Sequence, residues 1–230
     1  MDFKYLIILF FIYSFLGWLI EVMGKLIEKH RFINRGFLIG PVCPIYGVGC
    51  VLLTILLKPY LNNIFILFGM AIIICSVLEY LTSYIMEKLF KARWWDYSKY
   101  KYNINGRICL ETMTFFGILG CIVLYFLNPF FLNIISSINT IILQIIILTL
   151  LIIFVIDITI SSGVMIKFRN SMKILEKDGT EEITKMIKEI ITNRGYLLRR
   201  LIKAFPNIKS NRERLREIRL MIDKKLRGSK

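Results

Sequence analysis

Five long apolar runs constrain the fold of this chain more than any other feature of its sequence. A helix needs about 20 mostly apolar residues to cross the roughly 30 Å hydrocarbon layer of a bilayer. The runs that meet this requirement are residues 3–20, 37–57, 64–86, 108–127 and 138–160. Hydrophobic residues make up 56% of the 230 positions, and the mean hydropathy is +0.62. We therefore predict an all-α polytopic membrane protein with five transmembrane helices.

Basic residues are divided unevenly between the two sides that five spans would define. One side receives only Lys4 and Lys58, whereas the other receives the basic residues of the first and third loops and the whole carboxyl-terminal tail. By the positive-inside rule, the side with the basic loops is cytoplasmic. We predict an amino terminus outside the cell and a cytoplasmic carboxyl terminus.

The composition changes after residue 160 from mostly apolar to strongly basic. We therefore predict a transmembrane domain (1–160) followed by a basic tail (161–230). The tail contains nineteen basic and eight acidic residues and so carries +11 of the net charge of +15. Apolar residues at helical spacing predict cytoplasmic amphipathic helices, interrupted at Pro206. Such helices suit anionic head groups of the inner leaflet or another subunit, and the charge does not require nucleic-acid binding.

The entrance to the second apolar run, residues 34–47, contains three glycines and two prolines. A proline inside a helix costs about 3 kcal/mol, and hydrocarbon offers no partner for the freed backbone groups. Pro41 and Pro44 therefore predict a broken helix in a protein-lined or wet environment. Transporters often place a binding site at such a break.

The two predicted hairpins, formed by spans one and two and by spans three and four, have acidic residues and loops at similar places. Glu21 and Glu28 occur late in the first hairpin's outgoing helix, and Glu79 and Glu87 occur at matching places in the second. A basic, aromatic loop follows in both halves. This indicates a tandem repeat, as in some transporter folds; the alternative is that two cytoplasmic hairpins share boundary residues by necessity.

Four acidic residues lie at a similar depth near the predicted cytoplasmic ends of the spans: Glu21, Glu79, Glu111 and Asp157. An ionisable group there costs a few kcal/mol, so each should face the bundle interior, a cavity or a partner. Asp157 is the weakest member, because two serines follow it and an interfacial position would explain it.

Two interpretations of these acids remain open. In the first, they form structural ion pairs with Arg35, Arg93 and Arg107. In the second, acids and arginines line a polar pocket for a zwitterionic or charged solute or a lipid head group. The aromatic run 93–97 is typical of an interfacial belt, or of a clamp for a head group or cation. The candidate pocket residues are Glu21, Arg35, Cys43, Tyr46, Glu79, Glu87, Arg93, Trp95, Asp96, Arg107 and Glu111.

The sequence contains no P-loop, no cluster of metal ligands and no nucleophile elbow. Any ATPase must therefore be supplied by another chain, and we expect no cofactor, no metal and no known type of catalytic centre. An enzyme would have to use carboxylate, arginine or thiol chemistry, which leaves its catalytic residues unknown. Cys43 lies in an unusual backbone setting, where packing explains it more simply than nucleophilic catalysis does.

Two blocks of sequence carry a family resemblance. The first runs from Tyr13 through Glu21 to the broken segment, and the second includes Glu79, the run 93–98 and residues 103–110. Residues 5–160 resemble the bacterial family called putative ABC-transporter type IV, or CmpB-like. The resemblance implies a multi-pass protein of the bacterial plasma membrane that works as a permease, and the basic tail lies outside it.

Three functions follow from these observations. The first is a permease that works with a separate ATPase, as a homodimer because five spans are few for a pathway. The second is a membrane-embedded enzyme or lipid-handling factor at the inner leaflet. The third is a membrane scaffold whose tail recruits a partner.

Overall fold

The computed structural model describes residues 2–30, 32, 34, 36–90 and 93–177. Arg35 and the predicted amphipathic helices of the tail beyond 177 lie outside these residues. The described elements are α1 (Phe3–Lys29), α2 (Pro44–Leu56), η1 (Lys58–Tyr60), α3 (Ile64–Phe90), β1 (Asn103–Ile104), β2 (Ile108–Cys109), α4 (Leu110–Ile122), η2 (Val123–Leu127), α5 (Asn128–Ser136) and α6 (Thr140–Lys177).

Four helical segments of the described residues are long and apolar enough to cross a membrane: Phe3–Glu28, Ile64–Phe90, Leu110–Ser136 and Thr140–Ile166. The predicted second span is shorter than expected, because residues 36–43 are not helical and α2 has only 13 residues. At 1.5 Å per residue, α2 is about 20 Å long. Five complete spans are therefore not confirmed. Pro44 begins α2 at the position where a missing backbone donor costs least.

The predicted fourth span also begins later than expected. Ile108 and Cys109 pair with residues 103 and 104 in a small antiparallel hairpin, and the helix starts at Leu110. Asn105 (φ 53°) and Gly106 (φ 65°) form the turn of this hairpin. Asn-Gly is the preferred pair for such a turn, since both residues adopt positive φ. The fold is otherwise helical, in agreement with the predicted class.

The two helical hairpins are each held together at glycines. In the first, a Cβ on Gly47 would lie 2.2 Å from Ser14 Oγ of α1, and a Cβ on Gly17 would lie 2.2 Å from the Tyr46 ring. In the second, a Cβ on Gly117 would lie 2.7 Å from the Phe68 ring of α3. Small residues let membrane helices approach closely. The structure thus contains both predicted hairpins, while the tandem duplication stays a prediction.

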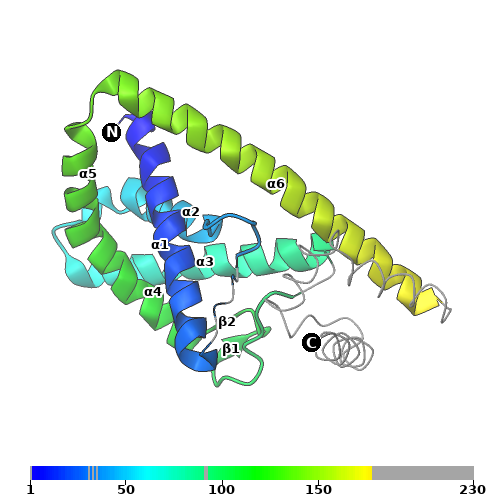
Figure 1. The fold of residues 1–230 in the computed structure, drawn as a ribbon. Coiled ribbons are helices and arrows are strands. Elements are labelled where there is room, and N and C mark those ends of the chain that lie inside the picture. The colour runs from blue at the N-terminus through cyan, green and yellow to red at the C-terminus, as the bar shows by residue number, and fades with distance from the viewer. Residues whose placement is uncertain (1, 31, 33, 35, 91–92, 178–230) are drawn as a thin grey trace.

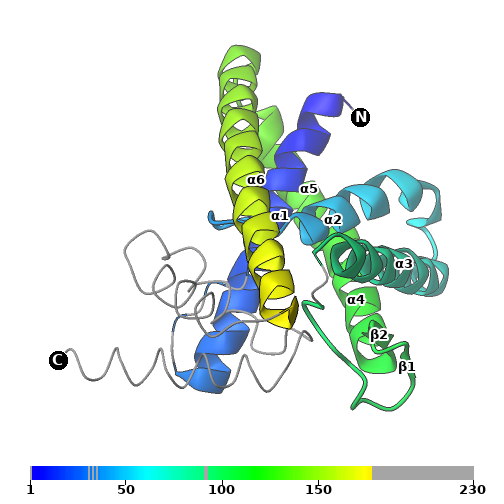
Figure 2. The same ribbon diagram turned by 90° about the vertical axis from the view of Figure 1, so that its right-hand side faces the viewer.

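Both views in Figures 1 and 2 place the amino terminus and the α5–α6 connection at one end of the molecule. The end of α1 and the β1–β2 hairpin lie at the opposite end. Helix α6 runs as one long rod along the outside. Its exposed surface is almost entirely apolar from Ile141 to Ile160, as expected for a helix that faces lipid.

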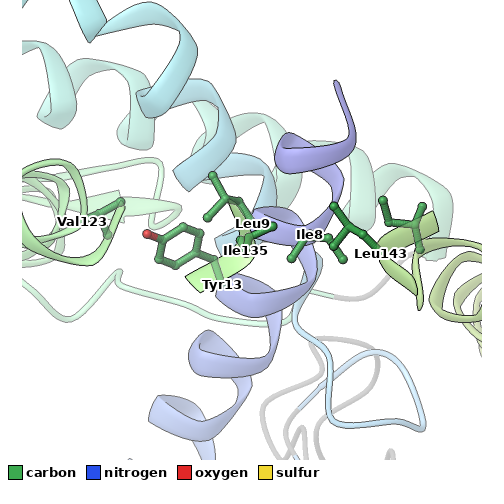
Figure 3. Close-up of a cluster of buried hydrophobic side chains, with 7 residues drawn as sticks. Ile8, Leu9, Tyr13, Val123, Ile135 and Leu143 are labelled. Carbon is green, nitrogen blue, oxygen red and sulfur yellow. The ribbon is translucent and has the colours of Figure 1, made fainter. Parts of the chain in front are cut away.

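The buried core joins α1 to η2, α5 and α6. Ile8, Leu9 and Tyr13 pack with apolar side chains from the other three elements, which are Val123, Ile135, Leu143 and Ile147 (Figure 3). The Tyr13 hydroxyl points to the Val123 side of this cluster and donates to Asn128 Oδ1 at 2.6 Å. Asn128 in turn donates to Thr54 Oγ1 of α2 at 2.8 Å. This chain of hydrogen bonds fixes three helices at one point.

Candidate functional site

Two tyrosine–carboxylate pairs lie between the hairpins. Tyr46 Oη of α2 donates to Glu21 Oε1 of α1 at 2.9 Å. Tyr97 Oη, from the loop after α3, donates to Glu79 Oε1 of α3 at 3.1 Å. These four residues are called the carboxylate–tyrosine cluster below. The prediction placed Glu21, Tyr46 and Glu79 among the candidates, whereas Tyr97 appeared only as one ring of the aromatic run.

Tyr97 connects the two pairs electrostatically. Burial raises the pKa of its phenol well above the usual range, and the charge of Glu79 raises it further. The charge of Glu21 acts in the same direction, so this carboxylate of α1 is close to the α3 pair. Tyr97 is therefore a hydrogen-bond donor at every physiological pH.

Glu79 is the most deeply buried member of the cluster, with 5% of its surface exposed. Ser76 and Ser83, about one helical turn to either side of it, are also buried. The three residues form a polar stripe on the inner face of α3. Within the described part of the chain, Glu79 Oε2 is buried without a hydrogen bond, and no basic side chain is at ion-pair distance. A carboxylate in this setting is costly to keep charged.

A separate ion network lies at the end of α3. Glu87 Oε2 accepts from Arg93 Nε at 3.1 Å and is 2.8 Å from a terminal nitrogen of Arg107. Arg93 is also 3.6 Å from Asp96 Oδ1. Among the described residues, Arg93 and Arg107 therefore pair with Glu87 and Asp96, and not with the four acids to which the ion-pair interpretation assigned them. Glu87 takes both arginines because it lies two turns beyond Glu79, level with the hairpin that carries Arg107.

Arg107 is held on several sides. Its guanidinium lies 5.6 Å from the Tyr80 ring centre and 5.4 Å from that of Tyr84. One terminal nitrogen donates to Ser83 Oγ at 3.2 Å. The Trp95 indole donates to the Arg107 carbonyl at 2.9 Å. Trp95 thus positions the hairpin, and these contacts explain both residues without a substrate.

Asn34 organises the broken segment before α2. Its Oδ1 accepts from the Trp18 indole at 2.9 Å and from the Gly36 backbone N–H at 3.0 Å. Its side-chain nitrogen donates to the Ile39 carbonyl at 3.0 Å. The Phe37 ring then packs 5.5 Å from Phe90 and 6.0 Å from Trp94, which attaches the segment to the end of α3.

Asp157 of α6 holds the same segment from the other side. Its two carboxylate oxygens accept the backbone N–H groups of Ile39 at 2.9 Å and Gly40 at 2.8 Å. Ser161 Oγ donates a third hydrogen bond at 2.9 Å. Asp157 thus has a partner in another segment, as expected for the four acidic residues, and its depth in the membrane stays a prediction. The signal for its real role was a Gly-Pro break, whose unsatisfied donors require an acceptor from another helix.

Of the remaining candidates, Cys43 lies beside Tyr46, which donates its backbone N–H to the Cys43 carbonyl at 3.1 Å. Cys43 is half-buried and donates its backbone N–H to the Ser14 carbonyl at 2.9 Å, which agrees with packing better than with catalysis. Glu111 is exposed in the first turn of α4, where a carboxylate favours the positive end of the helix dipole. Within the described residues, no three His, Cys, Asp or Glu side chains are grouped so as to hold a metal ion.

Comparison with known proteins assigns the chain to a family. A family model described as "Putative ABC-transporter type IV" matches residues 8–162. The chain belongs to this family. The match contains nearly all of both hairpins, the carboxylate–tyrosine cluster and Asp157, and it ends two residues into the basic tail. No curated protein and no solved structure matches the chain. Family membership and four long apolar helices fit a membrane component of a transporter.

Proposed function

We propose that this chain is the permease-like subunit of a transporter whose ATPase is a separate polypeptide. The observation that carries the proposal is the family match over residues 8–162, which contains all of the described spanning helices almost completely. The sequence supplies no P-loop of its own. The proposed location is the bacterial plasma membrane, with the amino terminus outside and the basic tail in the cytoplasm.

The proposed solute site is the carboxylate–tyrosine cluster, near the predicted cytoplasmic end of the bundle. Its carboxylates come from two different hairpins, and a broken segment lies beside it, as in many transporter sites. Two acids with two phenol donors suit a solute that carries a positive charge together with polar groups. We further propose a homodimer, because four or five spans are few for a complete pathway.

The experiment is purification of the tagged full-length chain from its native membrane in mild detergent. The proposal expects a P-loop ATPase to copurify in fixed stoichiometry, and to remain bound after exchange into nanodiscs. A matched sample of the Glu79→Gln variant should keep the complex but change its ATP turnover. Asp2 is an exposed carboxyl immediately before α1, at the end of that helix far from Glu21. The Asp2→Asn variant should change neither the complex nor its ATP turnover.

A purified chain that never binds an ATPase would contradict the proposal. Conversion of a lipid by that purified chain, abolished in Glu79→Gln, would instead favour the membrane-enzyme alternative.

A further inference from the structure

Glu79 has an environment that the transport proposal does not explain. It is a nearly fully buried carboxyl, one oxygen of which accepts from Tyr97 while the other has no hydrogen bond in the described part of the chain. Arg93 and Arg107, the nearest arginines along the chain, are committed to Glu87 and Asp96. Within the described residues, these two arginines therefore pair with Glu87, two helical turns beyond Glu79, and not with Glu79 itself.

The groups that interact with Glu79 come from several elements. Tyr97 donates to it from the loop, and Glu21 of α1 acts on it as a like charge. The Thr112 hydroxyl of α4 also lies close to it but donates to the Cys109 carbonyl at 2.9 Å. Cys75 is the titratable neighbour on its own helix. None of these groups carries a positive charge. A second carboxylate nearby makes simultaneous ionisation of both more costly.

We propose that Glu79 is a proton-binding site whose buried carboxyl exchanges between its carboxylate and carboxylic acid forms. The proton comes from water and binds Oε2, so the carboxyl gains one hydrogen and loses one negative charge. Tyr97 keeps its own proton and donates to Oε1 in both states. Proton uptake removes the negative charge on which the Glu21 carboxylate of the first hairpin acts as a like charge.

Asp157 provides a contrast within the same molecule. It lies in a spanning helix as Glu79 does, but its carboxylate accepts three hydrogen bonds, from two backbone N–H groups and Ser161. Hydrogen bonds to a charged carboxylate favour that form. Both Asp157 oxygens therefore have hydrogen-bond donors, whereas Glu79 Oε2 has none within the described residues.

The test is chemical labelling of the purified full-length chain in nanodiscs with dicyclohexylcarbodiimide, an apolar reagent that modifies protonated carboxyl groups. Mass spectrometry of the fragments reports the extent of modification at Glu79, Asp157 and Asp2 over a pH series. The expected result is modification of Glu79 at neutral pH that falls as the pH rises. Asp157 and Asp2 should remain unmodified at neutral pH.

A variant series adds a directional readout. Tyr97→Phe removes the donor that stabilises the carboxylate, so the ratio of protonated to ionised Glu79 should rise about fivefold at a given pH. Tyr102→Phe, an exposed tyrosine of the same loop, should leave it unchanged. Infrared spectra should show a neutral carboxyl band at neutral pH that is absent from Glu79→Gln.

Two results would overturn the proposal. The first is Glu79 modification no greater than that of Asp157 across the pH series. The second is a neutral carboxyl band that persists in Glu79→Gln. The inference does not rest on the proposed transport role, because it is measured on the isolated chain without ATP or an ATPase. Absence of an ATPase partner would leave it standing, and absence of labelling would leave the transport proposal standing.

Discussion

Gly40 donates its backbone N–H to Asp157 Oδ2 across 2.8 Å, which links the broken segment before α2 to the outer helix α6. A Cβ on Gly40 would lie 3.0 Å from that oxygen, so the absence of a side chain permits the approach. Pro41, the next residue, has no N–H to offer. The Asp157 carboxylate therefore supplies hydrogen-bond acceptors for the backbone N–H groups of Ile39 and Gly40. Backbone groups at membrane depth need such protein partners, because hydrocarbon offers none.

Asp157→Asn should destabilise the protein by about 1–3 kcal/mol, because one amide oxygen cannot replace two carboxylate acceptors for Ile39 and Gly40. The free energy of unfolding in mixed detergent micelles measures this change. Asp2→Asn is the matched control and should have little effect, since Asp2 is exposed and pairs only weakly with Lys4 at 3.4 Å. Equal stability of the two variants would contradict the role assigned to Asp157.

Gly47→Ala should destabilise the first hairpin by about 1–3 kcal/mol through overpacking. The new Cβ would lie 2.4 Å from the Phe10 backbone carbonyl, which cannot move aside as a side chain can. Gly69→Ala in α3 is the control, because nothing lies within 4 Å of its Cβ position. The control should be neutral or stabilising, and thermal unfolding midpoints would rank the two variants. A Gly47→Ala midpoint at or above that of the control would show that the helices are not in close contact.

Tyr13→Phe should cost about 1–3 kcal/mol, because it leaves Asn128 Oδ1 buried without its donor. Asn128 is 5% exposed and lies where η2 meets α5, immediately before Pro129. Tyr60→Phe, in the exposed connection after α2, is the control and should be neutral. The comparison uses chemical denaturation followed by tryptophan fluorescence. A neutral Tyr13→Phe would mean that the hydrogen bonds from Tyr13 to Thr54 do not hold the helices together.

Arg107→Lys should loosen the β1–β2 hairpin even though it keeps the charge. A lysine cannot pair with Glu87 and Ser83 while stacking on the rings of Tyr80 and Tyr84. Backbone amides of residues 103–109 should exchange with deuterium faster in this variant. Lys101→Arg, in the exposed part of the same loop, should leave the exchange unchanged. Unaltered protection in Arg107→Lys would show that the guanidinium geometry is not what orders the hairpin.

The sequence predicted the elements that depend on local composition. Four of the five apolar runs form helices that could span a membrane, and the break at Pro41 and Pro44 lies where two prolines must interrupt a helix. The acids Glu21 and Glu79 were recognised as inward-facing because a charge in lipid is costly. These conclusions need only residue type and spacing.

Partner choice could not be predicted, since it depends on contacts between distant segments. The separation of Glu87 from Glu79 along α3 decides which carboxyl receives Arg93 and Arg107, and only the position of the hairpin reveals it. Asp157 contacts a segment 117 residues away. Tyr97 could equally have been one more interfacial ring, until its hydroxyl was found on Glu79. The length of α2 also depended on tertiary context, because its apolar sequence alone suggested a full span.

The measurement that tests the transport account most directly is ATP turnover by the complex of this chain with its ATPase, reconstituted in nanodiscs. The account predicts a turnover rate that depends on the presence of the wild-type chain, and that changes several-fold in Glu79→Gln at equal complex content while Asp2→Asn behaves as wild type. Turnover that is the same with and without the chain would contradict the central claim that it is the permease-like subunit.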